Sequence, residues 1–531
     1  MAEKQEHIEK MEEKPLHLEK ERLKYKDKSF TEKLWHIKDN ITVEPLLAGM
    51  IIPSVISRFA MANFNLDKAC RVYFEFEDHI CNALVKKNSN NYSVYEKEVQ
   101  KLISSIDIWK SIIHTGLPFI MIMFLGAWSD RTGKRKLCIL LPIFGEVLTS
   151  LNNLVNVYFF YEIPVHITVF LETFFTAITG GWVTMFLGVF SYITDVTTEE
   201  YRTFRVGLVN IGMTVGLPIG IGMSGYLLKV ELGYYGIFSL TTVLFIAVLL
   251  YGCYSLQEPD EWLKERGMPI IERGNSKGVS FFDVTHVVDT MRVAFRKRPA
   301  NRRVKVILTL VAVFILFGPS MSEFNVFYLF VRNQLNWTPA KYSFFTSYSI
   351  ILHSIGTMFS ITVLSRKMQI DDSLLCLFSV SSKLLGSIWT AFVKSDLEMY
   401  LIPVVELLTG TIFTSLRSII SKLVDKQETA KVNSLFSLTE TLASLIFHPI
   451  YSWLYMNTLQ VMPGAVFLTS AFLILPASAI LIYFFTQHRV NLKNARKKAL
   501  EAEGKKENEV TKAPEKSPLP EIEPPFDSTR L

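Results

Sequence analysis

The sequence predicts an all-α polytopic membrane protein with twelve transmembrane helices in two groups of six. Hydrophobic residues make up 49% of its 531 residues, whereas charged residues make up only 20%. The apolar residues form blocks of about 20 residues, the length that crosses ~30 Å of hydrocarbon, instead of the amphipathic periods of soluble helices. A polar stretch divides the twelve blocks into six and six.

The blocks and the stretches between them give the order of elements along the chain. The spanning segments are expected near residues 42–63, 108–128, 137–160, 165–190, 206–228, 233–256, 304–330, 342–364, 373–394, 399–420, 435–457 and 463–486. The predicted domains are a polar tail at 1–41, a six-helix half at 42–256 with an outer loop at 64–107, a middle loop at 257–303, a six-helix half at 304–486 and a disordered tail at 487–531. Because the N-terminus has no apolar core, we expect no signal peptide.

Basic residues in the connections predict the orientation. They cluster between the second and third segments, at the end of the middle loop in RKRPANRR, and after the twelfth segment. Lys and Arg accumulate in cytoplasmic loops, so both termini and the middle loop are expected in the cytoplasm. The tail ends in Thr529-Arg530-Leu531, a triplet that would also suit a PDZ domain, although such triplets arise often by chance.

The first loop is then the largest outer loop. It contains a glycosylation sequon at Asn91, and a second sequon at Asn336 lies outside but close to the membrane. Cys70 and Cys81 share the first loop on the oxidising side, where they either pair or remain free. Within the middle loop, FFDVTHVVDTMRVAF is typical of a helix that lies on the membrane surface.

Several functional classes are excluded. A net charge of +6 is small for this length and does not suggest a nucleic-acid partner. The five cysteines show no metal-ligand spacing, and we find no nucleophile constellation. Without a phosphate-binding loop there is no ATP-driven step. We therefore expect a protein that is not an enzyme, needs no cofactor or metal, and has the lipid bilayer and a small solute as partners.

The loop between the second and third segments carries the strongest motif. It reads GAWSDRTGKRK, with the characteristic residues Gly126, Asp130, Arg131, Gly133, Lys134 and Arg135. Gly126 permits close helix contact, Gly133 permits a positive φ in a tight turn, and Asp130 can cap a neighbouring helix. The cations also hold the loop in the cytoplasm. The motif is therefore either a topology anchor or a conformational latch in which Asp130 changes partners.

The arrangement of six plus six segments around this motif resembles the major facilitator superfamily. The resemblance implies the major facilitator fold, with two six-helix pseudo-repeats. The corresponding loop of the second half, LSRKMQIDD, keeps Arg366, Lys367 and the acidic pair Asp371 and Asp372 but lacks the glycines. The latch is thus expected to be asymmetric between the halves.

Further motifs are similar to those of solute carrier family 46, which includes the proton-coupled folate transporter and its lysosomal relatives. They are Val43-Glu44-Pro45, Ser191 to Asp195, Arg202 to Arg205, Leu416-Arg417-Ser418 with Ser421-Lys422, and Glu440-Thr441-Leu442. We expect Glu44 to shape the entrance of the first helix. The resemblance covers about residues 42–486.

Three positions depart from that family. Where the folate transporter has a glutamate in the fifth segment and a histidine in the seventh, this chain has Asn210 and Leu316. The resemblance makes both positions proton-linked, so the departures argue against folate as the substrate. Relatives also carry a cysteine where this chain has Asn336, so Cys70 with Cys81 would replace their disulfide.

Ionisable residues inside spans usually face a cavity, because each costs roughly 2.5–3.5 kcal/mol at the bilayer centre. The candidates for substrate or proton binding are Glu172, His353, Glu406, Arg417 and His448. Asn210 is a further candidate, because it stands where the folate transporter has a glutamate. Further intramembrane candidates are Arg58, His114, Glu323 and Glu440. Glu146 and Lys383 lie in segments expected at the periphery, where they are interpreted as packing or snorkelling groups.

Two of these candidates have alternative interpretations. Arg417 either receives an anionic substrate or forms a permanent ion pair between helices. His353 and His448 either carry protons or act only as hydrogen-bonding residues. The predicted function is secondary transport of a small polar or anionic organic solute by alternating access, with proton coupling, at the plasma membrane or the lysosome. Alternatives are lysosomal export of muropeptide-like or conjugate solutes and a non-transporting receptor or scaffold.

Overall fold

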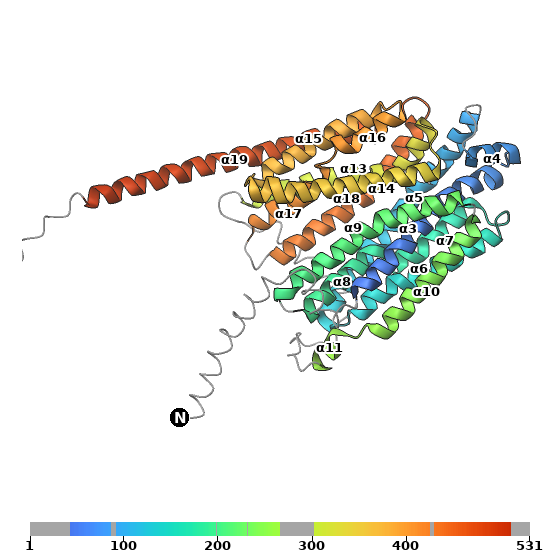
Figure 1. Cartoon of the computed structure of the whole chain (residues 1–531), viewed down its shortest axis with the longest axis horizontal. Helices are drawn as coiled ribbons and strands as arrows, with labels where there is room; N and C mark the ends of the chain where they lie inside the picture. Colours follow the sequence, from blue (N-terminus) through green and yellow to red (C-terminus); the bar gives the residue numbers. More distant parts are fainter. Residues whose placement is uncertain are drawn as a thin grey trace, which may run out of the picture.

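The computed structural model describes residues 43–86, 92–197, 199–230, 232–265, 302–424 and 429–510, which fold almost entirely into helices. Figure 1 shows two helical bundles lying side by side, one from each half of the chain. The sequon at Asn91, the stretch FFDVTHVVDTMRVAF, the tail at 1–41 and the C-terminal triplet lie outside the described residues.

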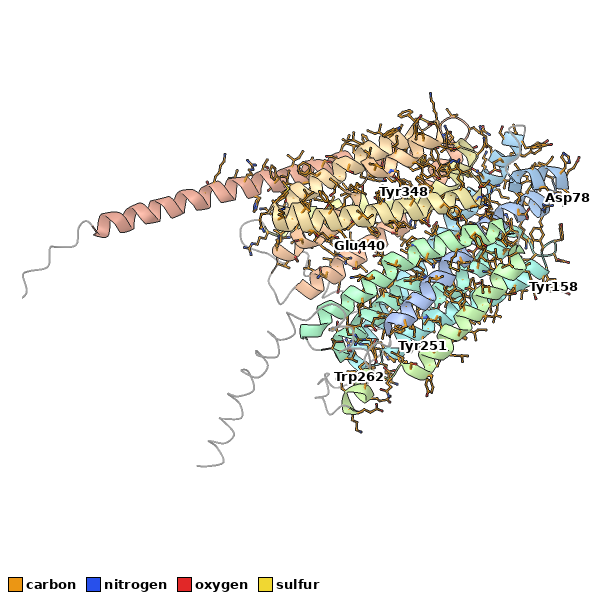
Figure 2. The ribbon with its side chains drawn as sticks, viewed as in Figure 1. Asp78, Tyr158, Tyr251, Trp262, Tyr348 and Glu440 are labelled. Atoms are coloured by element: carbon orange, nitrogen blue, oxygen red, sulfur yellow. A yellow bond between two sulfur atoms is a disulfide. The ribbon has the colours of Figure 1, made fainter. Side chains whose placement is uncertain are left out.

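The first bundle contains six spans. Its helices are α3 (Val43–Lys68) with the π-helical turn η2 (Ala69–Tyr73), α5 (Ser93–Thr132), α6 (Lys136–Tyr158), α7 (Val165–Ile178) with α8 (Gly181–Val196), α9 (Glu199–Lys229) and α10 (Gly233–Ser255). Two short helices flank the bundle, α4 (Asp78–Lys86) at one end and α11 (Pro259–Glu265) at the other. These ends are called the α4 side and the α11 side below. In Figure 2, Asp78 and Tyr158 lie at the α4 side and Trp262 at the α11 side.

The second bundle repeats this order. Its helices are α13 (Arg302–Gln334), α14 (Pro339–Phe359) with η4 (Ser360–Lys367), α15 (Asp372–Ala391), α16 (Asp396–Val405) with η5 (Thr409–Thr411) and α17 (Ile412–Lys422), α18 (Thr429–Thr458) and α19 (Ala465–Val510). Among the described residues, eleven helical stretches are long and apolar enough to cross a membrane. Helix α18, with 30 residues, is the remaining long helix and packs against α13 and α5.

Two predicted boundaries differ from the structure. The outer loop expected at 64–107 is largely helical, because α3 runs to Lys68 and α5 begins at Ser93. The first turns of α5 are too polar for a hydropathy window, yet Val99 and Ile103 are buried in the hydrophobic core at the α4 side, which stabilises the helix. At the other end of the chain, α19 continues to Val510, past residue 486 where a disordered tail was expected to follow.

Three large hydrophobic cores, and a smaller one around Phe64 and Phe238 in the first half, hold the bundles together. One core lies within the first half and includes Met50 and Phe245, and another lies within the second half and includes Val313 and Leu481. The third core lies at the α4 side and contains residues of both halves, with the fully buried Trp337 among them. The halves therefore share apolar packing at the α4 side.

One span in each half is broken at the corresponding position of the repeat. The fourth span is interrupted between α7 and α8 at Gly180 and Gly181, whose φ angles of +84° and +54° require glycine. The tenth span is interrupted between α16 and α17 by a turn that begins at Glu406 and by η5. Interrupted helices at matching positions of two repeats indicate a binding site in transporters.

Candidate functional site

Buried polar contacts join the two halves at the α4 side. The Arg332 guanidinium of α13 donates to Glu96 Oε1 of α5 at 2.6 Å and to the Leu84 carbonyl of α4 at 2.9 Å. Both side chains of the ion pair are at most 5% exposed. Nearby, Tyr455 of α18 donates to Gln100 of α5 at 2.9 Å. These contacts close the space between the halves at this side.

Helices α9 and α14 show that the halves separate toward the α11 side. Near the α4 side they touch, since Ser347 of α14 donates to the Pro218 carbonyl of α9 at 2.8 Å. The same helical stripe of α9 continues to Ile211, and that of α14 to Ile351 and Ile355. These three side chains are 50–55% exposed. The stripe that joins the halves at one side is therefore uncovered at the other.

The GAWSDRTGKRK loop lies at the α11 side and is held within its own half. Gly133 has a φ of +73° and caps α5, as the tight turn requires. Arg135 is buried and donates to Asp195 Oδ2 of α8 at 2.8 Å and to Ser129 at 3.0 Å. Its backbone N–H donates to Glu258. The Asp130 side chain lies outside the described part of the chain.

The remaining residues of the loop motif occupy different environments. Gly126 is buried, and a Cβ added there would lie 3.0 Å from Leu187 of α8. Close contact between α5 and α8 thus depends on this glycine. Arg131 is half-buried and Lys134 is exposed. The loop therefore brings the ends of α5, α6, α8 and α11 together.

The family motifs pair with one another across the structure. Arg205 of the Arg-Thr-Phe-Arg motif is 1% exposed and forms a bidentate ion pair with Glu44, at 2.8 and 3.2 Å. Asp195 pairs with Arg135, as described above. In the second half, Arg417 donates to Glu440 at 2.7 Å. Glu44, Asp195 and Glu440 are thus each the partner of a basic residue in another motif.

The first half presents cations and an aromatic ring toward the space between the halves. The Arg58 side chain is 44% exposed, and its guanidinium carbon lies 4.9 Å from the centre of the Trp182 ring of α8. Lys110 of α5 pairs with Glu172 of α7 at 3.3 Å. His114 lies one turn further along α5, on the same helix face as Lys110. This face suits an anionic group.

Glu146 connects this face to the third span. Its Oε1 accepts from Ser54 at 2.8 Å and lies 3.7 Å from Arg58 Nη2. Of the two interpretations of Glu146, packing or snorkelling, the second does not hold, because the side chain is buried and has polar partners. The side chain is buried between α3 and α6, and it helps to orient the Arg58 guanidinium.

The second half contains a buried charge cluster beside its broken helix. Lys383 Nζ lies 2.8 Å from Glu323 Oε2 of α13 and 3.1 Å from Glu406 Oε1 at the end of α16. His353 Nε2 of α14 lies 3.9 Å from Glu406 Oε2. The interpretation of Lys383 as a snorkelling residue is wrong, because the lysine points inward and its side chain is 14% exposed. We call Glu323, Lys383 and Glu406 the acid–lysine cluster.

The other candidates line the space without joining these clusters. Arg417 is 48% exposed although it pairs with Glu440, so the predicted ion pair forms while part of the guanidinium remains accessible. Asn210 is exposed on α9, on the uncovered part of the helix. His448 of α18 is half-buried, and its Nε2 has no hydrogen-bond partner in the described structure.

The cysteine pair and the sequon at Asn336, both predicted to lie outside, are found at the α4 side. A disulfide joins Cys70 of η2 to Cys81 of α4 and so ties α4 to the first span. Asn336 is exposed in the turn between α13 and α14, with a φ of +53°. The next two residues of its sequon are engaged, since Trp337 is buried and Thr338 caps α14.

Comparison with known proteins assigns the family. The Major Facilitator Superfamily model matches residues 102–448. The chain belongs to the major facilitator superfamily. The predicted fold class and the function as a membrane transporter are thereby confirmed.

Curated relatives of this major facilitator protein are members of solute carrier family 46. The chain is 22% identical over 440 residues to the probable peptidoglycan muropeptide transporter SLC46 of Drosophila melanogaster, covering 81% of this chain and 83% of that one. It is 26% identical over 404 residues to the human lysosomal proton-coupled steroid conjugate and bile acid symporter SLC46A3, covering 75% and 83%. It is 24% identical over 393 residues to the rat proton-coupled folate transporter, covering 72% and 80%.

Solved structures agree on the fold. The human organic anion transporter MFSD10 matches with a TM-score of 0.54 at 12% identity, covering 83% of this chain and 99% of that one. The inward open conformation of the xylose transporter XylE from E. coli matches with a TM-score of 0.52 at 13% identity, covering 83% and 95%. At such identities the likeness shows the arrangement of helices and not the substrate.

Sequence reasoning missed Lys110 as a member of the site. The residue lies at the start of the predicted second span, where a lysine is easily taken for a boundary residue. Its spacing held the signal, because Asp107, Lys110 and His114 follow one another at intervals of three and four and share one helix face. A predicted helix that began at residue 93 would have placed these three residues inside the bundle.

Proposed function

We propose that this transporter carries an organic anion with an apolar body through the space between its halves, driven by protons. The observation that carries the proposal is the exposed Arg58 guanidinium over Trp182, which faces a space closed at the α4 side. A guanidinium binds carboxylate or sulfate groups through two parallel hydrogen bonds. The α11 side, with its basic loop, would face the cytoplasm.

The aromatic side chains of α8 support an apolar body for the substrate. Trp182, Phe186 and Phe190 follow one another at intervals of four, with ring centres 6.0 and 6.5 Å apart, and none is fully buried. Such a row offers a flat apolar surface next to the Arg58 cation. A steroid conjugate or bile acid, named for relatives of this chain, combines these two features.

The relatives also support a second substrate class. A muropeptide, named for the relative of Drosophila, carries a carboxylate but a polar body. Arg417, which keeps half of its side chain exposed while paired with Glu440, would receive such a carboxylate from the second half. Folate is disfavoured, because Asn210 and Leu316 replace ionisable groups of the folate transporter.

In alternating access, the halves would separate at the α4 side and close at the α11 side. In the opposite state, the Arg332–Glu96 pair and the Tyr455–Gln100 bond would separate, and the exposed stripes of α9 and α14 would meet. The GAWSDRTGKRK loop would act as the latch of that motion, with Asp130 and Arg135 exchanging partners. The broken helices at Gly180 and Glu406 would allow the halves to bend near the substrate.

The test is uptake into proteoliposomes that contain the purified full chain, with an acidic outer buffer. The probes are radiolabelled estrone sulfate, taurocholate, muramyl dipeptide and folate. We expect estrone sulfate or taurocholate to accumulate, and Arg58→Ala to reduce that accumulation about tenfold, which is the effect of ~1.4 kcal/mol of lost binding. Arg58→Lys should retain an intermediate level, because it keeps the charge but not the bidentate fork.

The matched control is Arg489→Ala, which removes a cation near the end of the last span, away from the space between the halves. It should transport at the wild-type rate. Accumulation of muramyl dipeptide alone would favour the second substrate class. If no probe accumulates above empty liposomes, or if Arg58→Ala transports every probe as the wild type does, the proposal fails. A fluorescent tag on the full chain in cells would distinguish the plasma membrane from the lysosome.

A further inference from the structure

We propose that the acid–lysine cluster of the second half is the proton-binding site of this transporter, with His353 as its connection to the central space. The inference rests on the proposed proton-driven transport, for which it names the residues. It differs from the sequence-based expectation of single carriers, because the site is formed by Glu323, Lys383 and Glu406 acting together.

The charge balance of the cluster leaves room for one proton. One ammonium lies between two carboxylates, at 2.8 and 3.1 Å, and the three side chains are only 6–14% exposed. A buried unbalanced charge is costly, so the cluster gains by taking up one positive charge. One carboxylate oxygen, Glu323 Oε1, is buried without a hydrogen-bond partner in the described structure. The geometry therefore offers a place where a proton would complete the balance.

A proton suits this site better than a sodium ion. A metal cation needs several oxygen ligands around a central position, as hard cations do in proteins. Here the Lys383 ammonium already occupies the position between the two carboxylates. A proton adds no volume and removes the one surplus charge. Because the two carboxylates share the ammonium, the proton belongs to the pair and not to one glutamate.

The surroundings of the cluster point to one route for the proton. His353 reaches Glu406 from α14 with 27% of its side chain exposed, whereas the three cluster residues are largely covered. From α18 the neighbouring titratable group is Tyr451, whose hydroxyl pairs with Ser470 of α19 at 2.6 Å. The imidazole of His353 is thus the titratable group that links the central space with Glu406.

The packing around Glu406 couples this site to the broken helix. A Cβ added at Gly386 would lie 2.3 Å from Glu406 Oε1, so only glycine leaves room for the carboxylate. A Cβ added at Gly356 of α14 would lie 1.8 Å from the Leu407 carbonyl, in the turn that starts at Glu406. A proton on the carboxylate pair weakens the attraction between Lys383 and Glu406. The turn and α14 then become free to shift, which is the link between proton binding and movement.

Infrared difference spectroscopy tests the site without any substrate. Spectra of the purified full chain are compared between acidic and neutral buffer, and the carbonyl stretch of a protonated carboxyl group is followed. We expect this band in the wild type and its loss in Glu406→Gln and in Glu323→Gln, because the remaining carboxylate is then balanced by Lys383. Glu172→Gln, the matched change in the first half, should keep the band.

Two results would overturn the inference. One is a wild-type protein without the band, or with a spectrum that responds to sodium instead of acid. The other is a band that survives in both glutamine variants. Monodisperse elution of each variant in gel filtration shows that folding is intact, and Gln in place of Glu preserves the shape of the side chain.

Transport separates this inference from the proposed function. In proteoliposomes, Glu406→Gln should still exchange estrone sulfate across the membrane when its concentration is equal on both sides. It should lose the accumulation that a pH gradient drives in the wild type. Accumulation at the wild-type level in Glu406→Gln contradicts the proton site while transport stands. A wild type that moves no probe contradicts the proposed function, and the infrared band still decides the proton site.

Discussion

Each half places an inward-pointing lysine against a glutamate of its broken span. The two lysines differ in their exposure and in the number of carboxylates that they contact. In the first half Lys110 and Glu172 lie 3.3 Å apart, and the lysine side chain is 25% exposed. In the second half Lys383 is 14% exposed and contacts two carboxylates. The first lysine is the more exposed of the two, whereas the second cluster is more deeply buried and carries one surplus negative charge. In the proposed mechanism, one repeated framework serves substrate contact in one half and proton binding in the other.

The largest expected difference between the halves follows from removing the lysines. Lys383→Met leaves Glu323 and Glu406 as buried, uncompensated charges and should lower the free energy of unfolding by about 3–5 kcal/mol. Lys110→Met should cost only about 1–3 kcal/mol, because Asn65 still donates to Glu172 at 3.2 Å. Thermal unfolding of both variants in the same detergent shows which of them loses more stability.

The pH dependence of this comparison has a defined sign. In acidic buffer the two carboxylates left by Lys383→Met can take up protons, so the loss of stability should shrink as the pH falls. Adding Glu406→Gln to Lys383→Met should restore part of the stability at neutral pH. Equal unfolding midpoints for Lys383→Met and Lys110→Met would refute the proposed difference between a deeply buried and a more exposed cluster.

A smaller difference is expected for the ion pairs at the α11 side. Glu44→Gln leaves the buried Arg205 with a neutral partner and should cost about 1.5–3 kcal/mol. Glu440→Gln should cost less than ~1 kcal/mol of stability, because the Arg417 side chain is 48% exposed. Transport should reverse this order, since Arg417 faces the central space. If Glu440→Gln destabilises the protein more than Glu44→Gln, the division into structural and accessible pairs is incorrect.

The fold could be predicted from the sequence because its signals are local. The length of each apolar block identifies a span, and the GAWSDRTGKRK loop indicates the superfamily and the tight turn at Gly133. The helical extension of α5 was missed because its polar turns are stabilised by α4 and the shared core, which lie far away in the sequence. Hydropathy alone cannot register such tertiary support.

The candidate site could be predicted only in part. Glu172, His353 and Glu406 were identified because a charge inside a span is unusual. Their partners were not, since no sequence pattern shows that Lys383 of α15 turns toward α13 and α16 instead of the bilayer. The pairing of Glu44 with Arg205 likewise joins residues 161 positions apart. Neither broken span was predicted from the sequence, although Gly180 and Gly181 offered a signal in the fourth span that the tenth span lacks.

The last comparison concerns two glycines at matching places in the third and ninth spans. A Cβ at Gly145 would lie 2.9 Å from Thr179 Cβ and 3.0 Å from the Phe175 carbonyl. These atoms cannot move freely, so Gly145→Ala should cost about 1–3 kcal/mol of stability. A Cβ at Gly386 meets instead only side-chain atoms of Glu406, with Cγ at 2.2 Å and Oε1 at 2.3 Å, and no backbone atom. Gly386→Ala should therefore cost less stability than Gly145→Ala.

The functional effects of the two glycine changes should have the opposite order. In Gly386→Ala the displaced Glu406 carboxylate moves away from Lys383, so accumulation of estrone sulfate should depend less on the pH gradient than in the wild type. Gly145→Ala should keep the wild-type pH dependence in the fraction of protein that folds. Unfolding midpoints test the expected order of stability, and uptake at two outer pH values tests the expected order of pH dependence. If Gly386→Ala alters only stability, the contact between Gly386 and Glu406 serves packing and not proton coupling.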